Sequence, residues 1–303
     1  MNLFGVYICI QFALLASALI PESEFIQHIL FKLYTNKNPK DPQILRLYDY
    51  FSIRESNYNT RLQTKILIHG YIPNFDKRNT YVVRDAYLSL GDYNFIEVDW
   101  TYFSNTTYPK AVQLVPKIGE EVAKFVDDLN ELFELNFNES VIIGHSLGAH
   151  VSGFVGKFVK RGKIAGIVGL DPASIGYDYA VPGTHLEKTD ANYVETLHVS
   201  TIRGTLQPVG DVSFYANYGR ELPGCDDGII VVKDYCSHEG APRFYAAAIV
   251  GKLLGPYYKC ESFKNILEQN GCTELSVTAK IGDPLVINHV EGLYNLAVTD
   301  GDI

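Results

Sequence analysis

One pentapeptide constrains this chain more than any other segment: Gly144–Gly148, which reads Gly-His-Ser-Leu-Gly and has the form G-x-S-x-G. The apolar residues 141–143 before it predict a short buried strand, and residues 147–160 after it predict a helix rich in small side chains. A serine at such a junction lies on a sharp turn that exposes its hydroxyl, and side chains in place of the two glycines would collide there. The sequence therefore predicts that Ser146 is a nucleophile, with a glycine-rich structural turn as the alternative.

A serine hydroxyl is a weak nucleophile, so it needs a base, and the base needs an acid that orients it. We predict Asp171 as the acid because it ends a strand over residues 164–171, and neighbouring parallel strands end at one edge of a sheet. An exposed acidic turn residue is the alternative. The preferred base is His238, in a loop ahead of a helix predicted over residues 241–254. The resulting chain order of nucleophile, acid and base is that of α/β-hydrolases.

Two backbone N–H groups should face the negative oxygen that develops on an attacked ester. Leu147 offers one, because the first amides of a helix have no partner within it. Tyr71 offers the second, because it follows a predicted strand over residues 65–69 and Gly70 permits a turn there.

Strands and helices alternate along the chain, which predicts an α/β fold with a mostly parallel central sheet flanked by helices. An amphipathic helix is expected from about Lys117 to Phe133. No linker divides the sequence, so we expect one α/β-hydrolase catalytic domain over residues 19–303. The strands are predicted at residues 65–69, 94–100, 141–146, 164–171 and 192–200.

The first 20 residues carry no charged side chain, and small residues at 16–18 fit a cleavage site. We therefore predict a signal peptide over residues 1–18, with a membrane anchor as the alternative. No later stretch is apolar and long enough to span a bilayer, so an extracellular, secreted product without a transmembrane segment is expected. Asn105 and Asn138 begin N-x-S/T sequences and are candidate glycosylation sites.

Four cysteines remain once the signal peptide is removed, an even number that predicts two disulfides in an oxidising compartment. Of the three possible pairings we favour the two local ones, Cys225–Cys236 and Cys260–Cys272. Zinc is the alternative, but no Cys-x-x-Cys spacing supports it. The net charge of −9 argues against a nucleic-acid partner, and it leaves lipid contact to depend mostly on apolar side chains.

The motifs together resemble the animal secreted lipases of the pancreatic lipase type, particularly their single-domain insect members. The resemblance assigns Ser146, Asp171 and His238 to a catalytic triad and the Tyr71 and Leu147 amides to the oxyanion hole. The matching segments, in order, are Phe31–Thr35, Ile68–Tyr71, Val98–Trp100, Gly144–His150, Gly169–Ala173, Pro223–Cys225 and Cys236–His238.

The resemblance also implies a lid between Cys225 and Cys236, here the ten residues 226–235, which we call the lid segment. Full-size family members have a longer lid and a C-terminal lipid-docking β-sandwich, which we do not expect here. Ten residues pinned at both ends fold back over at most about 15 Å, too little to cover a deep acyl groove. We expect its apolar residues either to touch acyl chains or a bilayer, or to form a buried edge strand. The named lid residues are Asp226, Ile229, Ile230, Val231, Val232 and Tyr235.

Members with short lids resemble phospholipase A1 enzymes, so we expect phospholipase A1-type cleavage of a lipid at a membrane or micelle surface. The alternatives are a neutral glyceride lipase and, in another class, a non-catalytic lipid-binding or yolk-type storage protein. No cofactor or metal is expected. A structural calcium near Glu187 and Asp190 is left open, because His185 stands where related enzymes have arginine.

Overall fold

The computed structural model describes residues 20–71, 78–225, 227–252 and 255–299. The predicted signal peptide and Asp226 lie outside these residues. The helices described are α2 (Glu22–His28), α3 (Tyr50–Arg54), α4 (Arg78–Leu90), α5 (Thr101–Ser104), α6 (Tyr108–Phe133), α7 (Leu147–Phe158), α8 (Ile230–Ile249) and α9 (Phe263–Glu268), with short 3-10 turns at Phe137–Glu139, Lys188–Asp190 and Asn217–Gly219.

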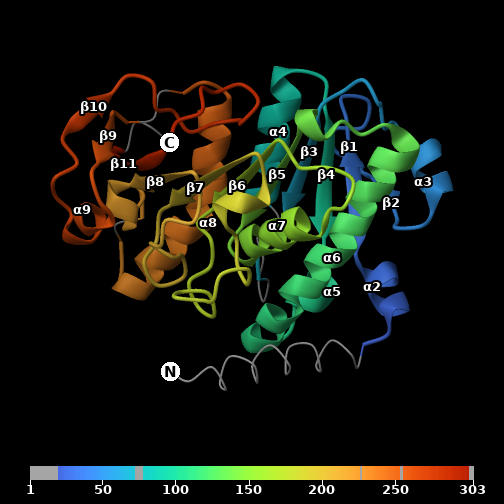
Figure 1. Cartoon of the computed structure of the whole chain (residues 1–303), viewed down its shortest axis with the longest axis horizontal. Coiled ribbons are helices and arrows are strands. Elements are labelled where there is room, and N and C mark those ends of the chain that lie inside the picture. The colour runs from blue at the N-terminus through green and yellow to red at the C-terminus, as the bar shows by residue number, and fades with distance from the viewer. Residues whose placement is uncertain (1–19, 72–77, 226, 253–254, 300–303) are drawn as a thin grey trace.

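Within that part of the chain, eleven strands form one sheet in the order β10-β9-β11-β8-β7-β6-β5-β3-β4-β1-β2 (Figure 1). The central strands, β11, β8, β7, β6, β5, β3 and β4, run parallel to one another. At the two edges of the sheet, β1, β2, β9 and β10 pair antiparallel with their neighbours. The predicted α/β-hydrolase class with a mostly parallel sheet is confirmed. The strands are β1 (Leu30–Tyr34), β2 (Gln43–Leu45), β3 (Thr64–Ile68), β4 (Asn94–Asp99), β5 (Ser140–His145), β6 (Gly166–Leu170), β7 (Tyr193–His198), β8 (Val212–Ala216), β9 (Tyr257–Cys260), β10 (Glu274–Ser276) and β11 (Gly292–Leu296).

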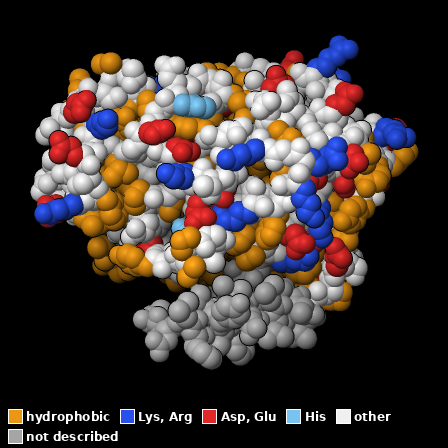
Figure 2. Space-filling view, viewed as in Figure 1, with side chains coloured by type: hydrophobic (Ala, Val, Ile, Leu, Met, Phe, Trp, Pro, Cys, Tyr) orange, Lys and Arg blue, Asp and Glu red, His pale blue; other side chains and the backbone are white. Residues whose placement is uncertain are grey.

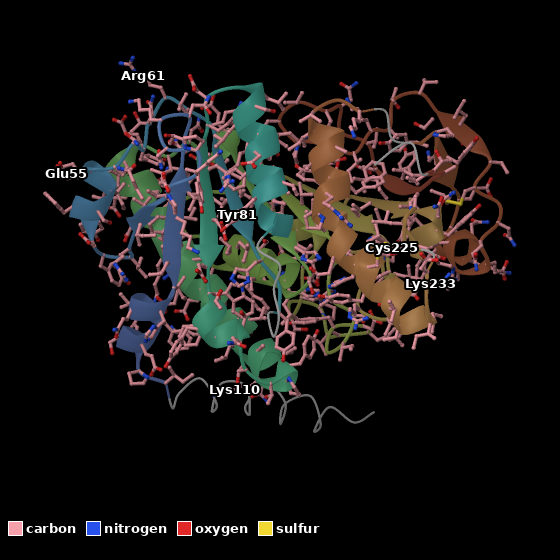
Figure 3. The ribbon with its side chains drawn as sticks, turned by 180° about the vertical axis from the view of Figure 1, so that it is seen from behind. Glu55, Arg61, Tyr81, Lys110, Cys225 and Lys233 are labelled. Atoms are coloured by element: carbon pink, nitrogen blue, oxygen red, sulfur yellow. A yellow bond between two sulfur atoms is a disulfide. The ribbon has the colours of Figure 1, made fainter. Side chains whose placement is uncertain are left out.

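Helices cover both faces of the sheet, and alternate residues of each central strand therefore point into two separate hydrophobic clusters. In β5, Ile142 packs in the cluster with residues of α6 and α7, whereas Ile143 packs in the cluster with residues of α4 and α8. Figure 1 shows α6 and α7 in front of the sheet, and Figure 3 shows α4 and α8 over the opposite face. Because both faces are buried, the central strands read as continuous apolar runs.

Two helices begin earlier than the sequence predicts, and each contains an internal proline. Helix α6 begins at Tyr108 and runs through Pro116, so the expected start near Lys117 is wrong. Helix α8 begins at Ile230 and runs through Pro242, so the loop expected around His238 is helical. No helix in the described ranges is both long and apolar enough to cross a membrane.

Candidate active site

The candidate nucleophile lies where β5 passes into α7. Ser146 has φ 57° and ψ −122°, a conformation that a non-glycine residue rarely adopts and that marks stored backbone strain. A Cβ on Gly144 would meet the backbone of Gly148, and a Cβ on Gly148 would meet the carbonyl of Ile68. The two glycines therefore permit the tight turn that places Ser146, which is buried, at the edge of the sheet.

The loop after β3 lies directly against this turn, because β3 is the parallel neighbour of β5 and Ile68 pairs with Gly144. A Cβ built on Gly70 would lie 2.7 Å from the Ser146 Cβ, so only glycine allows the two backbones to approach this closely. Tyr71 follows and is held by a hydrogen bond of 2.7 Å from its hydroxyl to the Thr106 carbonyl. The backbone of this loop and the amide end of α7, which begins at Leu147, thus flank Ser146.

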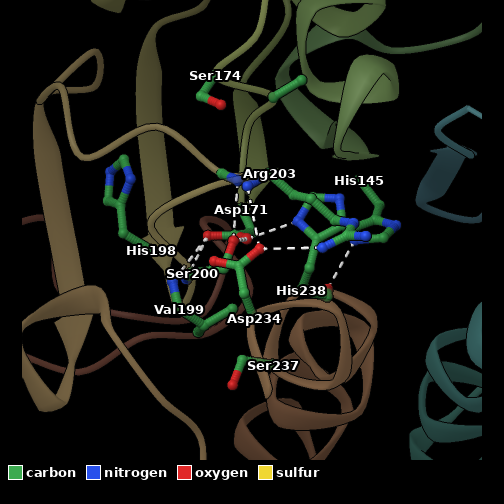
Figure 4. A network of polar contacts seen from close by, with 12 residues as sticks. His145, Asp171, Ser174, His198, Val199, Ser200, Arg203, Asp234, Ser237 and His238 are labelled. Carbon is green, nitrogen blue, oxygen red and sulfur yellow. Dashed lines mark hydrogen bonds and ion pairs between the residues drawn. The ribbon is translucent and has the colours of Figure 1, made fainter. Parts of the chain in front are cut away.

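Asp171 follows β6 at the same edge, and its carboxylate is fully buried. The Oδ1 atom accepts hydrogen bonds from the backbone amides of Val199 at 2.7 Å and Ser200 at 3.2 Å. The Oδ2 atom accepts from the Ser200 hydroxyl at 2.5 Å and from His238 Nδ1 at 2.6 Å (Figure 4). Four donors around one carboxylate stabilise its charged form and fix its orientation.

His238 lies on α8, with the imidazole almost fully buried. Since a carboxylate oxygen only accepts, the contact with Asp171 places a proton on Nδ1, so in the neutral form of the ring Nε2 is the nitrogen without a proton. Ser146 and His238 both line a cavity of about 350 Å³, together with Tyr71 and Tyr108. Within the described residues no hydrogen bond joins the Ser146 hydroxyl to His238; the two side chains share this cavity.

The neighbour of Ser146 in the chain also contacts the base. His145 Nε2 donates a hydrogen bond of 2.9 Å to the His238 carbonyl, and the two rings lie 4.8 Å apart. Burial lowers the pKa of His145 to about 4. His145 is therefore neutral at physiological pH and adds no positive charge beside the candidate base.

A second buried carboxylate organises the loop after β7. Asp234, one helical turn before His238 on α8, accepts hydrogen bonds from three consecutive backbone amides at 2.8, 2.8 and 3.1 Å, those of residues 201–203. The Arg203 guanidinium lies beside it, with Nη1 3.3 Å from Asp234 Oδ2 and 3.2 Å from the Val231 carbonyl. It also stacks 4.9 Å from the Tyr235 ring and, like Tyr235, lines the cavity.

The described part of the lid segment is helical from Ile230, so the interpretation as a buried edge strand is wrong. Its apolar side chains point to solvent: Ile229 is 71% exposed and Ile230 is 69% exposed, and Val231, Val232 and Tyr235 are also exposed. Figure 2 shows hydrophobic side chains gathered over the beginning of α8. Ile229 lies just before α8, and the other residues lie in its first two turns, ahead of His238 on the same helix.

Disulfides and ion pairs fix two further segments that the sequence analysis singled out. Cys225 is bonded to Cys236 and Cys260 to Cys272, which is the local pairing that was favoured. The carboxylates of Glu187 and Asp190 both contact the Lys157 ammonium, at 3.2 Å and 2.6 Å. A calcium ion there would compete with this lysine for the same oxygens. No group of three or more possible metal ligands occurs within the described residues.

Comparison with known proteins identifies the family of this chain. A family model described as Lipase matches residues 16–283. This chain belongs to the lipase family. It is 37% identical over 247 residues to phospholipase A1 member A of Bos taurus, covering 79% of this chain and 52% of the relative. It is 32% identical over 273 residues to pancreatic triacylglycerol lipase of Myocastor coypus, covering 84% and 59%. It is also 31% identical over 274 residues to inactive pancreatic lipase-related protein 1 of Mus musculus, covering 84% and 57%. The chain thus spans somewhat more than half the length of these curated relatives.

Reasoning from the sequence missed three residues that organise the site, namely Ser200, Arg203 and Asp234. Ser200 follows β7, the parallel neighbour of β6, so the sheet edge that predicts Asp171 also places Ser200 nearby. No comparable signal identifies Asp234 or Arg203, because their contacts depend on how α8 packs against the loop.

Proposed function

We propose that this protein is a carboxylic ester hydrolase that cleaves acyl esters of lipids, with Ser146 as nucleophile, His238 as general base and Asp171 as the orienting acid. The observation that carries the proposal is the 2.6 Å contact of Asp171 with His238 Nδ1, which makes Nε2 the proton acceptor of the neutral ring, in a residue that lines the same cavity as Ser146. Strain at Ser146 supports the same role, since such strain concentrates at functional sites.

In the proposed reaction, His238 Nε2 removes the proton of the Ser146 hydroxyl while the Ser146 oxygen attacks the acyl carbonyl carbon. The resulting oxyanion faces the amides of Tyr71 and Leu147, which donate to it as the negative charge develops. His238 then protonates the leaving alcohol, and an acyl-serine remains. Water, deprotonated by the same ring, attacks the acyl carbonyl, and collapse of the second intermediate returns the proton to Ser146 and releases the fatty acid. Each step uses only these side chains, backbone amides and water.

The gap between Ser146 and His238 is consistent with this mechanism, because catalytic hydrogen bonds are often long without substrate and tighten when it binds. The alternative from another class is a non-catalytic lipid-binding or storage protein. One observation favours it, because one of the relatives is named as inactive. Family membership alone therefore does not establish activity here.

A fluorophosphonate probe tests the hydrolase directly. We expect the probe to label the folded wild-type protein and to fail with Ser146→Ala, while His238→Gln labels much more slowly. A matched control is Ser152→Ala, because Ser152 lies on the same helix but its hydroxyl is bonded to the Gly148 carbonyl. No labelling of a folded wild-type sample would support the non-catalytic alternative.

Among lipids, we propose a phospholipid as the preferred substrate, with phospholipase A1-type cleavage, and a neutral glyceride as the alternative. The supporting residue is Arg203, a cation on the wall of the cavity that contains Ser146. Three backbone amides also donate to its neighbour Asp234, so the guanidinium is not the only donor to that carboxylate, although Glu239 on the same cavity wall carries the opposite charge. A phosphate can bind such a planar fork with two hydrogen bonds, whereas a triglyceride carries no anionic group.

Substrate preference is tested by comparing fatty acid release from phosphatidylcholine vesicles and from a triglyceride emulsion. We expect faster release from phosphatidylcholine, and we expect Arg203→Gln to lower kcat/KM for this lipid about 10-fold while triglyceride hydrolysis changes little. The control is Arg61→Gln, because Arg61 is exposed at the periphery of the molecule (Figure 3) and precedes β3, whose opposite end leads to the cavity residues Gly70 and Tyr71. Release from triglyceride alone would overturn the phospholipid preference without affecting the hydrolase proposal.

We further propose that the exposed apolar residues at the beginning of α8 touch the surface of a membrane or micelle when lipid enters the cavity. Their exposure and their position beside the cavity residue Tyr235 support this contact. Secretion is proposed as well, supported by the two disulfides, which persist in oxidising compartments. Asn105 and Asn138 are both exposed, so their side chains are accessible for glycosylation.

A further inference from the structure

A proline within α8 leaves one carbonyl of the helix without its usual partner. In an α-helix the amide of each residue donates to the carbonyl four residues earlier, and proline has no amide hydrogen. Pro242 stands four residues after His238, so the carbonyl left without a helical donor is that of the candidate base itself. An unpaired carbonyl in a buried environment is costly and needs another donor.

That donor is the side chain of His145. Its Nε2 lies 2.9 Å from the His238 carbonyl, and because a carbonyl only accepts, this nitrogen carries the proton. Both residues are almost fully buried, so water does not easily replace this hydrogen bond. The bond therefore links the residue immediately before the nucleophile to the main chain of the base.

We propose that His145 is a positioning residue, which sets the distance between Ser146 and His238 through the carbonyl that Pro242 leaves free. This inference rests on the proposed function. His238 is then fixed at two points: His145 holds its main chain and Asp171 holds its Nδ1. With both points fixed the ring has little freedom to turn, and Nε2 stays directed into the cavity. This hydrogen bond directly joins the two chain segments that carry the proposed nucleophile and base.

The donor of the hydrogen bond to the His238 carbonyl can be exchanged by substitution, and this tests the proposal. His145→Leu removes the donor, and we expect kcat for a short-chain p-nitrophenyl ester to fall about 10- to 100-fold with KM little changed, because misplacement of about 1 Å costs rates of this order. His145→Gln keeps an N–H near the position of Nε2 and should recover most of the loss. Pro242→Ala supplies a helical N–H to the same carbonyl, so the double variant His145→Leu/Pro242→Ala should recover at least about 5-fold over His145→Leu.

A purely structural role would not give this pattern, because Pro242→Ala would then restore stability without restoring kcat. Thermal unfolding of each variant measures stability separately from rate. If His145→Leu keeps the wild-type kcat, or if the folded double variant is as slow as His145→Leu, the inference is wrong.

Nitrogen-15 NMR of the wild-type protein gives a second test that requires no variant to fold. We expect the His145 ring at neutral pH as the Nε2–H tautomer, and the Nδ1–H tautomer would overturn the inference. Failure of the proposed function is recognised separately, because the wild-type protein would then neither react with the fluorophosphonate nor hydrolyse the ester.

Discussion

Replacing Gly70 by alanine tests the close contact between the loop after β3 and the turn that carries Ser146, the proposed nucleophile. The added methyl carbon would lie 2.7 Å from Ser146 Cβ and 2.9 Å from the His145 carbonyl oxygen. Carbon atoms in unstrained contact are about 3.5–4.0 Å apart, so the two backbones would have to separate by about 1 Å. A shift of this size in a reacting group lowers rates by about 100-fold. We therefore expect kcat of Gly70→Ala to be about 100-fold below the wild-type value.

The assay is hydrolysis of a short-chain p-nitrophenyl ester, with thermal unfolding measured on the same samples. Overpacking of this kind costs about 1–3 kcal/mol, which lowers Tm by several degrees and leaves the protein folded at assay temperature. Gly91→Ala is the matched control, because a Cβ there would meet only Tyr93, at an ordinary 3.7 Å. If folded Gly70→Ala hydrolyses the ester at the wild-type rate, the tight approach of this loop does not hold the oxyanion site in place.

Two further predictions concern buried ionisable groups. Lys65 is fully buried and forms an ion pair with Asp283. Lys65→Met should lower the free energy of unfolding, measured in urea, by about 3–5 kcal/mol, because a buried carboxylate loses its partner. Adding Asp283→Leu should restore much of the lost stability, and a double variant as unstable as the single one would contradict this reasoning. Burial lowers the pKa of His150 to about 3 and that of His198 to about 4, from the ordinary 6.5. At a pH between each lowered pKa and 6.5, the folded protein therefore binds fewer protons than the unfolded chain. Stability should be fully present above pH 6.5 and fall as the pH drops toward 4, by roughly 1.4 kcal/mol per pH unit for each histidine. Urea unfolding of His198→Gln between pH 4.5 and 7 should show a shallower slope, and an unchanged slope would rule out this contribution from His198.

The nucleophile turn and the sheet edge were predictable because both follow from local rules. A G-x-S-x-G segment between an apolar run and a helix defines the turn at Ser146, and parallel strands bring Asp171 to the same edge. The registers of β3 with β5 and of β5 with β6 show this arrangement, with Ile68 beside Gly144 and His145 beside Leu170.

The contacts around the proposed triad were harder to predict, because they depend on segments that are distant in the sequence. The sequence predicts a helix only from Ala241, whereas α8 begins at Ile230 and runs through Pro242. The contact of Ser200 with Asp171 joins residues 29 positions apart and requires the register of β6 and β7. Periodicity along a single sequence contains no information about such pairs.

One continuous helix carries both the exposed apolar residues of the lid segment and His238, and this restricts how the protein can diverge. An α-helix turns by about 100° for each residue, so one residue inserted between Asp234 and His238 would rotate all preceding helical residues to another side of the helix axis. Asp234 would then lose its three loop amides, and the exposed apolar side chains would move away from their present side of the helix. Descendants with longer lids can therefore accommodate extra residues only between Cys225 and Ile230, ahead of the first helical turn.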